Sequence, residues 1–237
     1  MMDRKEYQKY ISKETLMGPS SVCILEELIN RNPLKLKPED VVLDLGCGKG
    51  LTSLVIAKET GAKVLADDLW IKAEENESRF VQWGVGDKIT PVCADANALS
   101  FEPKSFKALF SVDAYHYFAG QTGFFEEKLL PFLADGAEVL IGVPGMKEDY
   151  AKQADELMAP WLGEEAYMFK SPKTWAGIIG SHARIESVET WEMDCFEEAW
   201  NEWFATEHPY AQGDRKFFDE LIKPYSCFVG MHIKIKG

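Results

Sequence analysis

The chain has 237 residues, of which 46% are hydrophobic and 27% charged, and its formal net charge is −13. This size suits one globular domain with a sizeable core, and the charge weighs against nucleic acids and anionic membranes, which are bound through basic patches. The five cysteines are scattered without a CxxC pair, so neither a metal site nor a disulfide framework is expected. No apolar stretch reads as a signal peptide or approaches the ~20 residues of a membrane span, so we expect a cytoplasmic protein.

The first part of the chain alternates between helical and extended patterns. Pro19–Asn30 predicts a helix, because Pro19 suits a first helical turn and the apolar residues share one face. Val41–Leu45 is apolar apart from Asp44, which is typical of a strand buried on both faces. The elements predicted next are a helix over 51–60 closed by Gly61, a strand over 62–66, a helix over 71–83, strands over 89–93 and 106–111, a helix over 124–130 and a strand over 138–143.

This regular alternation ends after residue 143. The later elements predicted are an aromatic-rich insertion over 144–172, a short helix over 173–180, a strand over 184–191, a helix over 194–206 and an alternating strand over 226–235. In the helix over 194–206, Asp194 and Glu197 have the spacing of a capping box. Trp200 and Trp203 belong to its apolar stripe, and we expect them in the core or an interface rather than in a substrate site.

The order of these elements predicts an α/β fold: a doubly wound, mostly parallel sheet with helices on both faces. We expect the whole chain, 1–237, to form a single domain with four parts. These are an N-terminal helical cap over 1–37, a ligand-binding core over 38–143, a lid insertion over 144–182 and a C-terminal hairpin region over 183–237.

Polar residues follow each of the first four predicted strands. Gly46–Gly50 follows the first strand, Asp68 the second and Asp95 the third, and Ser111 and Asp113 follow the fourth. Because ligands of open α/β sheets bind beyond the carboxyl ends of the strands, these residues predict one binding site.

The glycine turn, GCGKG, discriminates between two kinds of nucleotide ligand. A dinucleotide fold prefers the spacing GxGxxG, which cradles a pyrophosphate. Here the spacing is GxGxG, and Asp44 stands two residues before Gly46. A carboxylate would repel a pyrophosphate but attract an ammonium or sulfonium, so we expect a ligand with positive charge near the turn and a ribose near Asp68. The alternative function is that of an NAD-dependent oxidoreductase. The alternative role of Asp44 is only to cap the turn.

Five segments together resemble the class I S-adenosylmethionine-dependent methyltransferases over residues 38–145. They are VLDLGCGKG, VLADDLW, CADANALSF, FKALFSVDAYHYF and LADGAEVLIGVP. The resemblance implies a seven-stranded sheet with a C-terminal antiparallel hairpin and S-adenosylmethionine as the cofactor. The family usually has Pro-Gly-Gly before the fifth strand, where this chain has Ala134-Asp135-Gly136; this departure affects a turn rather than the cofactor site.

The resemblance also implies roles for individual residues. Asp44 would lie near the methionine amino group, Asp68, rather than its neighbour Asp67, would accept both ribose hydroxyls, and Ser111 would lie close to methionine. Leu69 would cover one adenine face, while Asp95 and the Ala96 N–H would bind the adenine edge. The cofactor-binding residues are thus expected to be Asp44, Gly46, Cys47, Gly48, Gly50, Asp68, Leu69, Asp95, Ala96 and Ser111.

Methyl transfer from a sulfonium is an in-line displacement, for which the protein supplies alignment and a dry site. His116, which follows the fourth strand, is the candidate general base, with a purely structural role in shaping the pocket as the alternative. The aromatic side chains expected around a small-molecule acceptor are Trp70, Tyr115, Tyr117 and Trp175. Two further functions stay open: an S-adenosylmethionine sensor without catalysis, and an enzyme like the cyclopropane-fatty-acid synthases.

Overall fold

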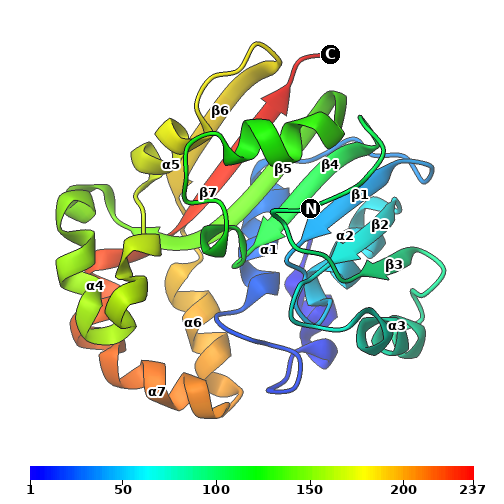
Figure 1. The fold of residues 1–237 in the computed structure, drawn as a ribbon. Helices are drawn as coiled ribbons and strands as arrows, with labels where there is room; N and C mark the ends of the chain where they lie inside the picture. Colours follow the sequence, from blue (N-terminus) through cyan, green and yellow to red (C-terminus); the bar gives the residue numbers. More distant parts are fainter.

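The computed structural model describes all 237 residues and is built around one seven-stranded sheet (Figure 1). The strands lie in the order β3-β2-β1-β4-β5-β7-β6; β1 to β5 are parallel, and β7 runs antiparallel between β5 and β6. The predicted doubly wound sheet with a C-terminal antiparallel pair is therefore confirmed. The strands are β1 (Val41–Leu45), β2 (Lys63–Asp67), β3 (Ile89–Val92), β4 (Phe106–Val112), β5 (Leu133–Met146), β6 (Ile185–Glu192) and β7 (Ser226–Ile235).

Helices cover both faces of the sheet. One face packs against α1, α2, α3, α6 and α7, and the other against α5 and a single π-helical turn, Phe125–Leu129. That turn takes the place of the longer helix predicted over 124–130, because Pro131 follows directly. The helices are α1 (Ser21–Arg31), α2 (Leu51–Thr60), α3 (Ala73–Gln82), α4 (Ala154–Leu162), α5 (Pro172–Ile179), α6 (Phe196–Ala205), α7 (Pro209–Phe217) and α8 (Lys223–Tyr225).

The starts of helices α1 and α6 differ from the prediction for reasons that the side chains show. α1 begins after Pro19, because the Ser20 hydroxyl caps it by accepting the Cys23 N–H at 3.3 Å. The capping box predicted for α6 does not form: Cys195 occupies the cap position without a side-chain bond. Long-range contacts replace the box, since the Cys195 N–H donates to Glu27 at 2.8 Å and Glu197 pairs with Lys223 at 2.7 Å.

Strand β5 is longer than the predicted 138–143, so the segment predicted as an insertion begins later than residue 144. Its carboxyl end continues to Met146 because β7 supplies a partner for every residue from Glu138 onward. The polypeptide between β6 and β7 is also more helical than expected, since α7 follows α6. The two indole N–H groups of Trp161 and Trp203 donate to opposite oxygens of Asp214, each at 3.1 Å, and so connect the segment of α4 to α6 and α7.

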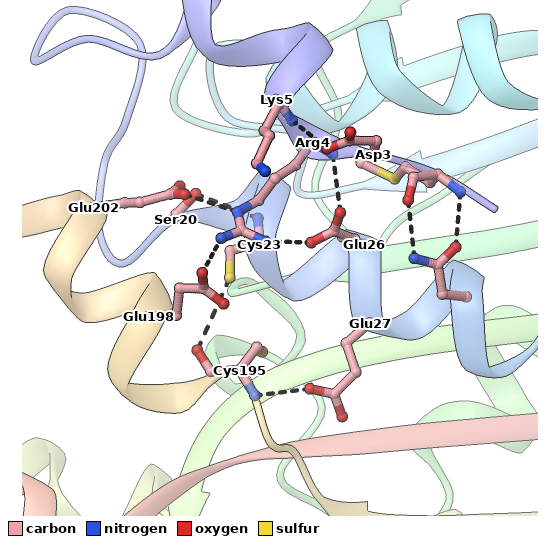
Figure 2. A network of polar contacts seen from close by, with 12 residues as sticks. Asp3, Arg4, Lys5, Ser20, Cys23, Glu26, Glu27, Cys195, Glu198 and Glu202 are labelled. Atoms are coloured by element: carbon pink, nitrogen blue, oxygen red, sulfur yellow. Dashed lines mark hydrogen bonds and ion pairs between the residues drawn. The ribbon is translucent and has the colours of Figure 1, made fainter.

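The N-terminal segment, residues 1–20, is fastened to the helical layer by one arginine (Figure 2). The Arg4 guanidinium pairs with Glu26 on α1 and with Glu198 and Glu202 on α6. The Met2 N–H also donates to the Asn30 side chain at 2.8 Å. The residues that follow run along the carboxyl end of the sheet. None of the helices combines the length and the apolar character needed to cross a membrane.

Candidate functional site

The glycine loop after β1 is shaped by three left-handed residues. Gly46, Gly48 and Gly50 have φ angles of 75°, 54° and 82°. A Cβ on Gly46 would lie 2.3 Å from the Cβ of Ala114, and one on Gly50 would meet the Phe80 ring at 2.4 Å, so side chains are excluded at both positions. The loop is held down because the N–H groups of Gly46 and its neighbour donate to the carbonyl oxygen of Asp67.

Two adjoining cavities open at this end of the sheet. The loop cavity lies between the glycine loop and residues 15–21 of the N-terminal end. The strand-end cavity lies over the ends of β2 and β3. Both are lined by the same five residues where they meet: Gly46, Asp68, Trp70, Ala114 and Tyr117.

Asp68 forms part of the wall between the cavities and is fixed by three backbone donors. One carboxylate oxygen accepts the Gly48 N–H at 2.8 Å, and the other accepts the N–H groups of Trp70 and Ile71 at 2.8 and 2.9 Å. The oxygen that accepts from Trp70 and Ile71 has both lone pairs engaged, whereas the oxygen that accepts only the Gly48 N–H keeps one lone pair for a ligand. Asp68 therefore lies at the strand end predicted from the sequence, between the two cavities.

Asp67 is buried rather than exposed and also lines the strand-end cavity. It accepts the Ala94 N–H at 2.9 Å, which ties the end of β2 to the segment after β3. Burial raises the pKa of Asp67 to about 7, and the neighbouring charge of Asp68 adds to this effect. Asp67 therefore has a structural bond that the sequence did not indicate.

Asp44 lies behind the loop and lines neither cavity. One of its oxygens accepts the hydroxyls of Thr52 and Ser53 at 2.7 and 2.6 Å, while the other is buried without a partner. Burial raises the pKa of Asp44 to about 6. The carboxylate thus fixes the first turn of α2, and Thr52 stands between it and the loop cavity.

Of the other predicted cofactor residues, the structure brings most to the two cavities. Cys47 and Gly48 line the loop cavity, and Leu69, Asp95 and Ala96 line the strand-end cavity. Gly50 packs on Phe80 instead, and the Ser111 hydroxyl donates to the carbonyl of Leu45 at 2.7 Å, which joins the ends of β4 and β1.

The predicted acceptor residues divide into two pairs. Trp70 and Tyr117 line both cavities and contact each other edge to face, with ring centroids 5.3 Å apart. Tyr115 and Trp175 are fully buried, 5.7 Å apart, in the core on the α5 face, and line neither cavity. The expectation that this second pair lines an acceptor pocket is therefore wrong, because apolar packing against β5 and β7 takes both rings inward.

His116 is not placed to act as a base. The ring is buried, its Nδ1 has no partner, and it lines neither cavity. Burial lowers the pKa of His116 to about 3, so the imidazole is neutral and weakly basic. The ring packs on Tyr117, with centroids 4.0 Å apart, and so supports the residue of this loop that does reach the cavities.

Asp113 was expected among the strand-end residues of the site, but the sequence gave it no individual role. It lines the loop cavity and has a φ of 55°, in a region that non-glycine residues rarely adopt. Its position directly after β4 was the available signal. Burial raises the pKa of its carboxyl to about 7, with a further contribution from the charge of Asp214.

Comparison with known proteins agrees with this geometry. Residues 42–128 match the family model of a methyltransferase domain. The fold is similar to that of geranyl diphosphate C-methyltransferase from Streptomyces coelicolor A3(2), at 14% identity over 91% of this chain and 78% of that one, with a TM-score of 0.69. A putative sarcosine dimethylglycine methyltransferase from Galdieria sulphuraria matches at 15% identity over 90% and 84%, with a TM-score of 0.69. Phosphoethanolamine N-methyltransferase 2 from Haemonchus contortus matches at 19% identity over 94% and 54%, with a TM-score of 0.68.

These matches confirm the resemblance predicted from the five sequence segments. Residues 42–128 match a methyltransferase domain, and the chain as a whole has the fold of the class I S-adenosylmethionine-dependent methyltransferases.

Proposed function

We propose that this protein binds S-adenosylmethionine across the two cavities and transfers its methyl group to a small-molecule acceptor. The observation that carries the proposal is the wall between the cavities, where a glycine loop without side chains meets the fixed carboxylate of Asp68. Support also comes from similar folds that hold S-adenosylhomocysteine in the Streptomyces enzyme and S-adenosylmethionine in the Haemonchus enzyme.

The residues present fit this cofactor. The strand-end cavity offers an apolar surface at Leu69 and Ala96 for an adenine ring, and Asp95 at its edge as an acceptor. Asp68 would accept a ribose hydroxyl at the junction through the oxygen that binds only Gly48, and the loop cavity would take the methionine end. In this arrangement Asp44 contributes through α2 and the glycine loop rather than by direct contact.

When bound, S-adenosylmethionine supplies a methyl group on a sulfonium sulfur. Trp70 and Tyr117 lie where the cavities meet, and electron-rich rings at that place would favour a sulfonium and exclude water from it. The chain then has to align an acceptor behind the methyl carbon, which is the main contribution that a displacement of this kind requires. We propose that residues 15–21 and the helical segments around α4 close over this acceptor.

Calorimetry with S-adenosylhomocysteine, S-adenosylmethionine and NAD tests the proposal. We expect both S-adenosyl compounds to bind and to raise Tm, since a ligand of the folded state adds about 2.7 kcal/mol at a hundredfold excess over its Kd. NAD should do neither, and its binding without S-adenosylhomocysteine would refute the cofactor assignment. Release of S-adenosylhomocysteine from pooled small-molecule acceptors separates an enzyme from a sensor, which would bind the cofactor without turnover.

A further inference from the structure

One carboxylate of the site has no partner for its charge. Asp44, Asp67, Asp68 and Asp95 all accept hydrogen bonds from hydroxyl or backbone N–H groups. The side chain of Asp113 accepts none and forms no ion pair, although it lines the loop cavity beside them. Partial burial without a donor disfavours the charged form of this carboxylate in the ligand-free protein, so a cationic ligand in the loop cavity would stabilise it.

The backbone holds this carboxylate in place. The Asp113 N–H donates to the carbonyl of Gly142 at 2.7 Å, and its φ of 55° places it in the left-handed region. Strained residues of this kind persist where the surrounding structure fixes them, and they concentrate at ligand sites. Gly18 packs against the carboxylate: a Cβ on this glycine would lie 2.7 Å from Oδ2.

We propose that Asp113 binds the ammonium group of the methyl acceptor, so that the acceptor is an amine and the reaction an N-methylation. This assignment rests on the proposed function and adds the substrate class to it. The surroundings fit an alkylammonium, because Trp70 and Tyr117 line the same cavity; burial, with a smaller contribution from the charge of Asp113, raises the pKa of Tyr117. A carboxylate combined with aromatic rings is suited to a cationic nitrogen.

The position of the carboxylate favours the acceptor over the cofactor as its partner. Its Oδ2 lies against Gly18, in the N-terminal segment that lines the loop cavity opposite the glycine loop. That segment lies outside the matched methyltransferase domain, residues 42–128. An acceptor that enters beneath Gly18 would meet Asp113 first.

The step balances without any further reactant. The acceptor ammonium gives one proton to the Asp113 carboxylate, and its nitrogen lone pair forms the new bond to the methyl carbon. The carbon–sulfur bond breaks as its electron pair returns to sulfur, which leaves a neutral thioether. The product is the methylated ammonium, and the proton on Asp113 then passes to solvent. The raised pKa of Asp113, about 7, suits a group that takes up a proton near neutral pH.

The test compares the wild type with two variants, Asp113→Asn and Asp87→Asn. Asp87 serves as the control because its carboxylate is exposed and lines neither cavity. The probes are S-adenosylmethionine labelled in its methyl group and two fractions of a bacterial small-molecule extract. One fraction is retained by a cation exchanger at acid pH and contains the amines; the other passes through. S-adenosylhomocysteine affinity is measured for each protein by calorimetry.

We expect the labelled methyl group to be transferred to compounds of the retained fraction. The label should be released from these products only under conditions that break C–N bonds. Asp113→Asn should slow this transfer by about 10- to 150-fold, the range for one charged hydrogen bond, while S-adenosylhomocysteine affinity changes less than about twofold. Asp87→Asn should match the wild type in both measurements.

Three results would overturn the assignment: label in the unretained fraction alone, wild-type transfer by Asp113→Asn, or loss of S-adenosylhomocysteine affinity in that variant, which would give the carboxylate to the cofactor. Absence of label from both fractions in a wild type that binds S-adenosylhomocysteine refutes catalysis, and the acceptor assignment with it. Absence of that binding refutes the proposed cofactor instead.

Discussion

Asp113→Asn should make the ligand-free protein more stable at alkaline pH. Burial holds the pKa of Asp113 at about 7, against an ordinary value of 3.8, so the folded protein disfavours the charged carboxylate. At 1.36 kcal/mol per pKa unit, the difference of about 3 units corresponds to an upper limit of about 4 kcal/mol at pH 8. Asparagine removes the charge and tolerates the left-handed φ of 55° as well as aspartate does.

The sign of the pH dependence follows from the raised pKa. Between pH 4 and pH 7 the folded protein binds the Asp113 proton more tightly than the unfolded chain, so the wild type gains stability as the pH falls. The advantage of Asp113→Asn is therefore largest above pH 7 and fades towards pH 4. Asp44 and Asp67, whose pKa values are also raised, titrate in both proteins and cancel in the comparison. Asp214, which adds to the pKa of Asp113, is likewise present in both.

Chemical and thermal unfolding of the two proteins at pH 8 and pH 5 measure this effect. A gain of about 2–4 kcal/mol at pH 8 corresponds to a Tm increase of at least about 4 °C in a domain of this size, and the gain at pH 5 should be less than half as large. Asp87→Asn serves as the exposed control and should change stability by less than about 0.5 kcal/mol. A stability gain that is equal at both pH values, or a loss at pH 8, would show that the carboxylate is satisfied in the folded protein.

Three further predictions concern the glycine loop, the carboxylate of Asp68 that we propose binds the ribose, and the N-terminal segment. Gly48→Val should weaken S-adenosylhomocysteine binding at least about tenfold in a folded protein, because a branched side chain disfavours a φ of 54°; unchanged calorimetry would reduce the loop to a structural turn. Asp68→Asn should weaken the same ligand by about 10- to 150-fold, whereas Asp67→Asn, which keeps an acceptor for its backbone partner, should stay within about threefold; the reverse order would exchange their roles. Arg4→Met should lower the free energy of unfolding by about 1–3 kcal/mol because three carboxylates lose their partner, and Lys5→Met by less than about 0.5 kcal/mol; equal values would show that the Arg4 network adds nothing.

The parallel sheet could be predicted because its strands are short apolar runs separated by glycines and acids. Strand β1 and helix α2 have the predicted bounds, since the apolar run of one and the caps of the other are local features. The capping box of α6 was a local pattern too, but Glu27 from α1 takes the backbone donor at its start. A contact between residues 27 and 195 cannot be seen in a short sequence window.

The candidate site shows the same division. Residues such as Gly46 and Asp68 could be found from their place after a strand, because the topology brings all strand ends together. The directions in which the side chains of the loop after β4 point could not be predicted in this way. Tyr115 turns into the core and Tyr117 reaches the cavities, although both are tyrosines in one short segment. The left-handed φ of Asp113, which a composition-based argument does not reveal, helps to set these directions.

The distribution of the site over the chain bears on how its specificity is determined. The residues assigned to the cofactor lie within 42–128, the part that matches a methyltransferase domain. The cover of the loop cavity comes from residues 15–21, and Arg4 fastens their segment to α1 and α6. Because α6 is in turn joined to α4 and α7 through Asp214, the N-terminal segment and helices α1, α4, α6 and α7 are connected by side-chain contacts. Asp113 lies at the boundary, on the matched domain but against Gly18 of the cover. On the proposed function, a change in the cover should therefore alter which acceptor is methylated, and it should alter S-adenosylhomocysteine affinity only where the changed residue borders the part of the loop cavity assigned to the methionine end.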